Sequence, residues 1–479
     1  MTQDIQVDPA TLPVDLHDVQ GNILRGYRKL KSRHLTAKVK DANAAKNWVA
    51  AVSAKDASGG PVVTRGSDWG DNPPDVCLNI GVTYAGLRAL GVPSISTESF
   101  SDAYKQGMVA RADKIGDWTS SAPEHWQPQF QDNDALHLIL TLHANTSELM
   151  DDYEALIMSS GGDKAFTILG RNQGEEFDPG IVHFGYRDGI SQPRFPGVSK
   201  PGRYDDQPIA PFGTVLLGYS TAMEQLTWTL PNPELLGKNG AFGAFRVLEQ
   251  DVEGFEAYLD YGAKVLLDSD IADDLLPPDF AANNPSDEER FAAMREVVAG
   301  KFAGRWRTGT PLALSPREPS PEPPVSDTNF DYSDDIDGLK CPLGSHLRRS
   351  NPRSSKIVQR VSNHTRRLVR RNLPYGPEYD PANPTKAERG LVGYFICADI
   401  SAQFEALQYD WINLGLQDPR ITGVNDPLLG DNDADASWFD VDTENGSVRL
   451  CGFPKFVMTR GGAYVLLPSL TALRWLGSL

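Results

Sequence analysis

Cysteine is scarce in this sequence. The 479 residues include only four cysteines, Cys77, Cys341, Cys397 and Cys451, and no two of them form a CxxC pair. The chain therefore has no pattern for a zinc ribbon or a thioredoxin-like redox site. Four scattered thiols fit a reducing compartment, so we expect a cytoplasmic protein.

Long hydrophobic runs are missing as well. No apolar stretch approaches the roughly 18 residues that a transmembrane helix needs. The first 20 residues contain neither a basic region nor an apolar region of the kind found in signal peptides. We therefore expect no signal peptide and no membrane span.

Basic residues are outnumbered. Lysine and arginine total 46 against 64 aspartates and glutamates, which gives a formal net charge of -18 and a pI near 4.9. This balance argues against nucleic acid or an anionic membrane as the main partner. The length predicts two to three domains with a large core.

One stretch of this acidic chain lacks acids altogether. Between Arg348 and Arg371 the sequence holds eight arginines and one lysine, with no aspartate or glutamate, and His346 precedes it in a Gly-Ser-His turn. A histidine beside clustered arginines suits an iron-porphyrin, because imidazole binds the metal and guanidinium binds carboxylates. A structural histidine, a solvated surface or a nucleic-acid patch are the alternatives.

The remaining pattern consists of strands that are each followed by a helix. Such pairs are predicted at 76–82 with 83–91, 135–143 with 145–157, 241–248 with 252–259, 391–400 with 401–413, and 463–468 with 469–477. A further helix is predicted over 36–54. LRALG (87–91) and LRWLG (473–477) indicate a duplicated architecture. Long, mixed connections favour antiparallel α+β over a doubly wound parallel sheet.

The segment 180–197 breaks the pattern with four glycines and two prolines. Its single acid, Asp188, lies between Arg187 and Gly189. Glycines beside a carboxylate let the backbone approach a flat ligand closely. A surface turn is the alternative interpretation.

Three motifs in this order resemble the dye-decolourising (DyP-type) haem peroxidases. They are GYRDG (185–189), GSHLRRSNPR (344–353) and LVRRNLPYG (368–376). Similar segments occur at 19–29, 304–314, 403–411 and 456–470, so the resemblance spans almost the whole chain. It implies an α+β fold of two ferredoxin-like domains with antiparallel sheets, of the dimeric α+β barrel type. We place these domains at 1–225 and 226–479, with haem in the second.

The resemblance also implies roles for the motif residues. His346 is expected to bind the haem iron, and Asp188 to act as general acid–base. Arg370 is expected to stabilise the peroxide anion. Asn372 shares the catalytic pocket, because residues two apart on an extended backbone face the same side. His346 needs an acceptor on its other nitrogen, and Asp426 is the candidate, with an ordinary Asn-Asp-Pro turn as the alternative.

Further positions follow from the same resemblance. Arg353 is expected to bind a haem propionate, and the other predicted cofactor contacts are Leu391, Phe395 and Gln192. Gly393 is smaller than a bulky residue expected at this place, which bears on the width of the distal pocket. Tyr375 and Trp411 are candidate surface sites for electron transfer. Trp411 also shares helical spacing with Phe404 and Leu407, so a core position is the alternative.

The sequence thus predicts a peroxidase with one haem b per chain. Its expected partners are hydrogen peroxide and phenolic, dye-like or other small aromatic one-electron donors. Because a carboxylate transfers protons best near its pKa, we expect activity to favour acidic pH. The alternatives are a haem or porphyrin carrier without turnover, and a scaffold without haem whose basic run binds an anionic partner. A solvated loop explains the Asp334-Asp335 pair as well as a manganese site does.

Overall fold

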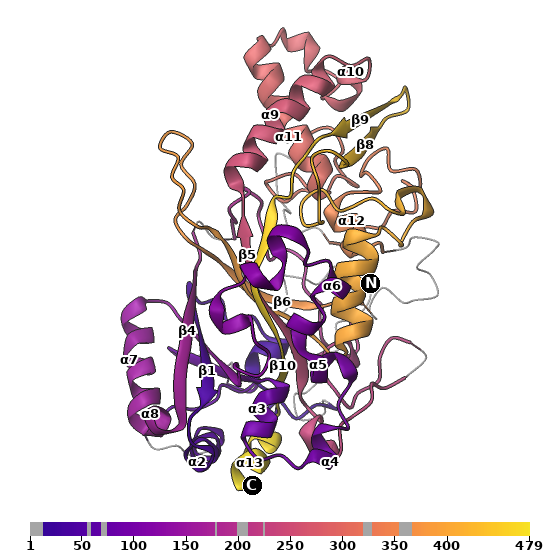
Figure 1. Ribbon diagram of the computed structural model, residues 1–479. Coiled ribbons are helices and arrows are strands. Elements are labelled where there is room, and N and C mark those ends of the chain that lie inside the picture. Colours follow the sequence, from indigo (N-terminus) through magenta and orange to yellow (C-terminus); the bar gives the residue numbers. More distant parts are fainter. Residues whose placement is uncertain are drawn as a thin grey trace.

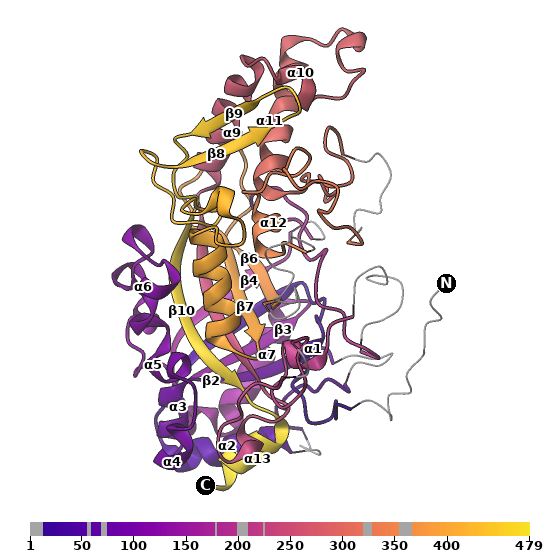
Figure 2. The same ribbon diagram turned by 90° about the vertical axis from the view of Figure 1, so that its right-hand side faces the viewer.

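The computed structural model describes most of the chain. Its described residues are 13–54, 59–68, 74–177, 180–198, 209–223, 226–319, 328–353 and 366–479. Within them, two βαββαβ units join edge to edge in one eight-stranded sheet (Figure 1, Figure 2).

The first unit occupies the N-terminal half. It consists of β1 (Lys31–Val39), α2 (Ala42–Ser53), β2 (Cys77–Val82), β3 (Leu138–Ala144), α7 (Ser147–Ile157) and β4 (Phe166–Glu175). Its strands lie in the order β4-β1-β3-β2, and all neighbours are antiparallel. α1 (Gly21–Leu24) precedes β1, and the connections hold α3 (Tyr84–Ala89), α4 (Ser94–Thr97), α5 (Asp102–Ala110), α6 (Ala112–Ile115) and α8 (Asp163–Ala165).

The second unit repeats this order. It consists of β5 (Ala241–Gln250), α9 (Val252–Leu267), β6 (Val369–Tyr375), β7 (Gly390–Cys397), the π-helix η10 (Ile400–Asn413) and β10 (Val457–Leu467). Its strands lie in the order β10-β5-β7-β6, again with antiparallel neighbours. Its connections hold α10 (Ala272–Leu275), α11 (Asp287–Ala303), α12 (His346–Ser350), β8 (Trp438–Asp442) and β9 (Ser447–Cys451), and α13 (Leu470–Ser478) ends the chain.

The two units meet where Leu466 of β10 pairs with Val82 of β2. The same strand order in each half confirms the predicted α+β fold of two ferredoxin-like units. The predicted boundary at 225/226 falls between β4 and β5, and it stays a prediction because residues 224 and 225 lie outside the described residues.

Two details of the sequence-based prediction are wrong. Residues 36–39, expected in a helix, belong to β1. This strand is buried on both faces from Ser32 to Ala37, so it lacks the one-sided pattern of a half-exposed strand. LRALG and LRWLG do not mark the repeat either, because α3 follows the second strand of one unit and α13 follows the fourth strand of the other.

The helices α9 and α11 form an arm with the β8–β9 hairpin, at the top of Figure 1. The Asp251 carboxylate accepts a hydrogen bond from the Gly254 amide at 2.9 Å and so caps α9. A capping box between Ser286 and Glu289 starts α11, and Gly304 ends it in the left-handed conformation, with φ at 89°. A second core cluster, rich in phenylalanine, holds this arm together.

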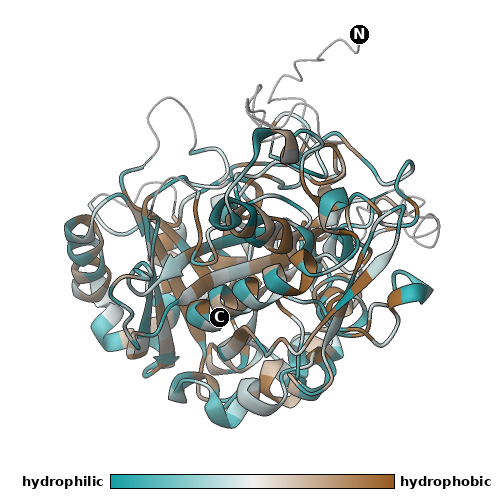
Figure 3. Cartoon of the chain, turned by 90° about the horizontal axis from the view of Figure 1, so that it is seen from above, coloured by the Kyte–Doolittle hydropathy of each residue, from teal (hydrophilic) through white to brown (hydrophobic). Residues whose placement is uncertain are grey.

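The main core lies around the sheet. Hydrophobic residues gather in the central strands, while hydrophilic residues colour the outer helices and loops (Figure 3). On the C-terminal half of the sheet, one face packs toward the first unit, where the ring of Phe245 lies 5.0 Å from that of His34. Alternating residues of the same strands face the other way and are free to line a site.

In the described part of the chain, we find no helix with the length and apolar character required to cross a membrane.

Candidate active site

A cavity lies against this second face of the sheet. Three strands contribute alternate residues to its wall: Arg370 and Asn372 from β6, Leu391, Gly393 and Phe395 from β7, and Arg246, Leu248 and Gln250 from β5. The rest of the lining comes from the 182–193 segment, residues 303–306, α12, residues 366–368, η10, Leu428, Leu429 and Val457. The cavity offers about 300 Å³ to water-sized molecules, which is at the lower end of the range of small-ligand pockets.

His346 begins the short helix α12 and lines this cavity. The hydroxyl of the preceding Ser345 donates to the carbonyl of Lys301 at 2.5 Å, which fixes the start of α12 on the end of α11. Nδ1 of His346 lies 2.9 Å from Oδ2 of Asp426. Among the described residues, Nε2 has no hydrogen-bond partner, so it is available to a ligand in the cavity.

Asp426 is completely buried, and the contact with His346 expected from the sequence is present. Its Oδ1 accepts hydrogen bonds from the amides of Leu428 and Leu429 at 2.8 and 2.9 Å. Burial acts to raise the pKa of Asp426, but the charge and hydrogen bond of His346 and the charge of Arg349 hold this pKa below its ordinary value. An ionised acceptor keeps the proton on Nδ1 and the lone pair on Nε2.

Asp188 lies in a tight turn on the same cavity. Gly185 and Gly189 flank it with φ values of 80° and 69°, which favour glycine. Oδ1 of Asp188 lies 2.5 Å from Nη2 of Arg370, and Oδ2 lies 3.4 Å from Nη1. Burial acts to raise the pKa of Asp188, but the charge of Arg370, assisted by further hydrogen bonds, holds it below the ordinary value. The site therefore pairs an ionised carboxylate with a guanidinium.

Gln192 does not line the cavity. Its side-chain oxygen accepts a hydrogen bond from the Arg370 amide at 3.1 Å, and its amide nitrogen lies 3.4 Å from the Arg370 carbonyl. Gln192 thus fixes the backbone that carries Arg370. Asn372 points into the cavity beside Arg370, as the extended backbone predicts.

Gly393 lies between Asn372 on β6 and Arg246 on β5 in the sheet register. Its φ is 151°, and a Cβ built at this position would come within 2.1 Å of the Arg371 carbonyl oxygen. This backbone therefore accepts only glycine, and no side chain from this position narrows the cavity.

Arginines dominate the charged lining of the cavity. Besides Arg370 and Arg246, they are Arg187, Arg305, Arg366 and Arg367. Burial, together with the charge of Arg353, lowers the pKa of Arg367 to about 10, which still leaves it a cation at neutral pH. Asp188 is the one acidic residue among the described lining residues, so this cavity suits an anionic ligand.

The structure does not place Arg353 in this lining, contrary to the sequence-based expectation. Its guanidinium donates to the carbonyls of Thr328 and Phe330 at 2.7 and 2.6 Å and stacks on the Phe330 ring at 3.8 Å. The chain turns after α12, with Arg353 in the left-handed conformation at φ 51°, and this turn directs the side chain elsewhere. Arg366 and Arg367 line the cavity instead.

Trp411 is not a surface residue, because only 5% of it is exposed. Its ring lies under the guanidinium of Arg366, at 4.9 Å, and Phe404 of the same helix is buried too. The alternative interpretation of Trp411 as a core residue therefore agrees with its burial better than the surface site does. Tyr375 is half-buried at the end of β6 and lies outside the cavity lining.

Sequence reasoning missed the buried ion pair behind Arg246. The two terminal guanidinium nitrogens of Arg246, Nη1 and Nη2, donate to the carboxylate of Asp117 at 2.6 and 2.7 Å, and Nη2 also donates to the Thr459 hydroxyl at 2.6 Å. The two partners are 129 positions apart, and no local pattern links them.

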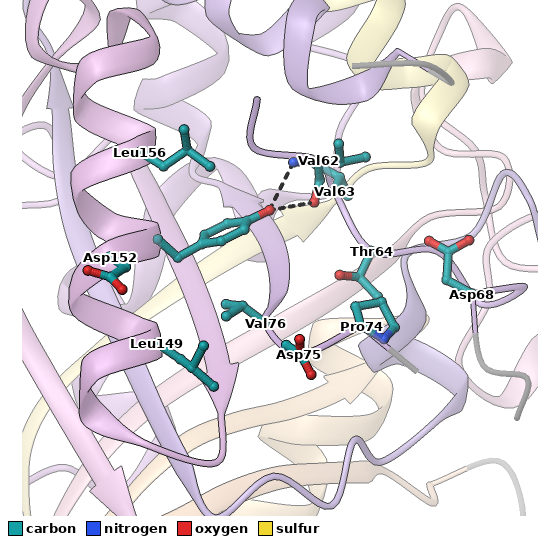
Figure 4. Close-up of a pocket in the computed structure, with 11 residues that line it drawn as sticks. Val62, Val63, Thr64, Asp68, Pro74, Asp75, Val76, Leu149, Asp152 and Leu156 are labelled. Carbon is teal, nitrogen blue, oxygen red and sulfur yellow. Dashed lines mark hydrogen bonds between the residues drawn. The ribbon is translucent and has the colours of Figure 1, made fainter. Parts of the chain in front are cut away.

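A second concavity lies between α7 and the segments 62–64 and 74–76 (Figure 4). Tyr153 is one of its lining residues, and the Tyr153 hydroxyl hydrogen-bonds the backbone of Val62. Among its described lining residues the charged ones are Asp68, Asp75 and Asp152, and none is a histidine or a basic residue. This concavity therefore lacks the groups that a metal-bearing anionic cofactor requires.

The fold and the site together indicate the class of protein, an α+β barrel peroxidase. The fold is a duplicated ferredoxin-like fold, and one cavity holds both a carboxylate-bound imidazole and an Asp–Arg pair. Residues 18–174 match the family model of the DyP dimeric alpha+beta barrel domain. Over this domain the chain is similar to dye-decolorizing peroxidases, and it is an oxidoreductase of the peroxidase class.

Individual relatives agree with this assignment. The chain is 28% identical to dye-decolorizing peroxidase AauDyP1 of Auricularia auricula-judae, over 98% of this chain and 87% of the relative. It is 29% identical to the multifunctional dye peroxidase DyP2 of an Amycolatopsis species, over 83% and 81% of the two chains. A solved dye-decolorizing peroxidase in complex with 2,6-dimethoxyphenol superposes with a TM-score of 0.79 at 25% identity, covering 97% of this chain and all of the other.

Proposed function

We propose that the protein is a haem-dependent peroxidase that holds one haem b in the cavity. It reduces hydrogen peroxide with electrons from phenolic, dye-like or other small aromatic donors. The observation that carries this proposal is that His346, held at Nδ1 by Asp426 and with no partner on Nε2 among the described residues, shares a cavity with the Asp188–Arg370 pair.

The residues present fit a haem. Leu391, Phe395 and Leu428 offer apolar surface for a macrocycle, while Arg305, Arg366 and Arg367 offer cations for its carboxylates. When bound, haem would supply the redox-active iron at which peroxide is reduced and the donors are oxidised. The cofactor would be held mainly by the second unit, residues 226–479.

His346 would ligate the iron through Nε2. The hydrogen bond from Nδ1 to the buried Asp426 orients the ring and increases its basicity. The amides of Leu428 and Leu429 hold the acceptor in turn, so Asp426 cannot rotate away without losing two hydrogen bonds.

Asp188 would carry the proton. Its carboxylate takes a proton from one oxygen of hydrogen peroxide and delivers it to the other oxygen, which leaves as water. Arg370 stabilises the negative charge that develops meanwhile, and Asn372 lies beside it. Two donors each supply one electron and one proton, so one peroxide yields two waters.

The proposed pH dependence follows from the Asp188–Arg370 pair. A pKa below the ordinary value keeps Asp188 ionised in mildly acidic solution. The base form is lost only as pH falls through this lowered pKa, so activity persists at acidic pH.

The donor and the location complete the proposal. A relative in complex with 2,6-dimethoxyphenol supports a phenolic donor. Tyr375 and Trp411 remain candidates for relaying electrons, Trp411 from a buried position. The four cysteines carry no disulfide, in keeping with the proposed cytoplasmic location.

One spectrum separates the proposal from its alternatives. A Soret band excludes a scaffold without haem, and rapid spectral change on adding peroxide excludes a carrier without turnover. Asp188→Asn should leave the Soret band in place and slow the peroxide reaction by about 10²–10⁴-fold. Asp440→Asn on β8, outside the cavity lining, is the control. Unchanged turnover in Asp188→Asn would remove Asp188 from its role.

A further inference from the structure

We propose that Tyr186 is a positioning residue for Asp188, because its hydroxyl fastens the 185–189 turn to the end of α11. This inference rests on the proposed role of Asp188 as the proton carrier. Tyr186 stands two residues before Asp188 and lies along the same cavity.

The fastening is a single part-buried hydrogen bond between distant parts of the chain. The Tyr186 hydroxyl donates to the carbonyl of Ala299 at 2.7 Å, and Ala299 is completely buried. Burial raises the pKa of the Tyr186 phenol, so the hydroxyl keeps its proton and stays a donor at working pH. A phenylalanine at this position would leave the ring in place and remove this bond alone.

Arg307 holds the same turn from a second side. Its carbonyl accepts a hydrogen bond from the Arg187 amide at 2.9 Å. Its guanidinium lies 5.9 Å from the centre of the Tyr186 ring and binds Glu256 of α9 at 2.5 Å. The residue next to Asp188 is thereby tied to the arm formed by α9 and α11.

The turn needs such external anchors because of its own composition. Gly185 and Gly189 both have positive φ, and glycine gains the most conformational freedom when a segment loosens. Two hydrogen bonds hold the turn within its own segment. The Asp188 amide donates to the Gly180 carbonyl at 2.6 Å, and the Gly185 amide donates to the Val182 carbonyl at 2.7 Å. A displacement near 1 Å would already disturb the 2.5 Å contact between Asp188 and Arg370.

The end of α11 also supports the other side of the site. The Ser345 hydroxyl binds the Lys301 carbonyl two residues beyond Ala299, immediately before His346. Tyr186→Phe leaves this second bond intact. Its effect is therefore confined to the Asp188 side, which separates positioning of Asp188 from general loosening of α11.

The test compares Tyr186→Phe with Tyr258→Phe in the haem-loaded protein. Tyr258 is a matched control, because its hydroxyl also donates to a backbone carbonyl, that of Cys451 at 2.9 Å, and its ring packs in the same core cluster. We expect Tyr186→Phe to lower the rate constant for hydrogen peroxide about tenfold, short of the roughly 100-fold that a 1 Å misplacement causes. Amide hydrogen exchange in residues 180–190 should accelerate, while the Soret band and the His346–iron vibration stay unchanged.

Arg307→Lys provides a second variant, because it keeps the charge and loses the planar fork. It should accelerate exchange in the same segment. The inference is overturned if Tyr186→Phe exchanges and reacts like the wild type, or if Tyr258→Phe shows equal changes. A wild-type protein that binds no haem or ignores peroxide would instead overturn the proposed function, while the exchange comparison would still report on the turn.

Discussion

Removing the negative partner of the buried Arg246–Asp117 pair should destabilise the protein strongly. The side chains of Arg246 and Asp117 are only 4% and 3% exposed, and their contacts of 2.6 and 2.7 Å are bidentate. Asp117→Asn keeps the shape and leaves a buried guanidinium without its counter-charge. Such a change costs about 3–5 kcal/mol. At about 2–4 °C per kcal/mol for a unit of this size, the melting temperature should fall by roughly 6–20 °C.

The control uses the same geometry at the surface. Arg449 and Asp440 also form a bidentate pair, at 2.7 and 2.9 Å, but are 52% and 30% exposed. Asp440→Asn should cost about 0–1 kcal/mol and so less than about 4 °C. Calorimetry of the haem-loaded variants measures both. Equal shifts for Asp117→Asn and Asp440→Asn would refute the reasoning from burial.

Three further predictions concern the cavity. Arg370→Leu removes the charge that lowers the pKa of Asp188, so that pKa rises and the acidic limb of the pH–rate profile moves toward neutral pH; steady-state rates from pH 3 to 7 test this, and a stationary limb contradicts it. Asp426→Asn should weaken the basicity of His346 and lower the His346–iron stretching frequency in resonance Raman spectra, whereas an unchanged frequency removes Asp426 from its supporting role. Gly393→Ala should destabilise by about 2 kcal/mol or more in chemical denaturation, because its Cβ meets backbone at 2.1 Å and its φ is unfavourable, and a neutral effect contradicts this geometry.

The sequence was informative where one short segment carries both the residue and its reason. Arg370 and Asn372 alternate on one strand, so their shared cavity could be predicted from spacing, whereas the place of Asp188 in the same cavity was expected only from the family resemblance. The strand–helix succession likewise predicted the antiparallel α+β class, because the apolar strands, the helices that follow them and the long, mixed connections are all visible in the local sequence.

Tertiary geometry decided the rest. Eight arginines between 348 and 371 are chemically equivalent in the sequence. Arg366 and Arg367 line the cavity, whereas Arg353, in the left-handed conformation, donates to backbone carbonyls instead, and no sequence pattern distinguishes these arginines. The burial of Trp411 depends in the same way on what packs over it, here Arg366. Local patterns contain no information on such partners.

The duplicated strand order shows which connections between the repeated elements carry the residues of the site. Both units have the same strand order, but they carry long insertions in different connections. The first unit has one between β2 and β3, and the second has one between α9 and β6. The latter insertion delivers α11 and the His346 helix, while the former delivers Asp117 beneath Arg246. These two insertions do not carry the whole site, because Asp188 comes from the connection between β4 and β5 and Asp426 from the connection between η10 and β10. Moving this active site onto another two-unit barrel would therefore require all four connections, together with Arg370 of β6.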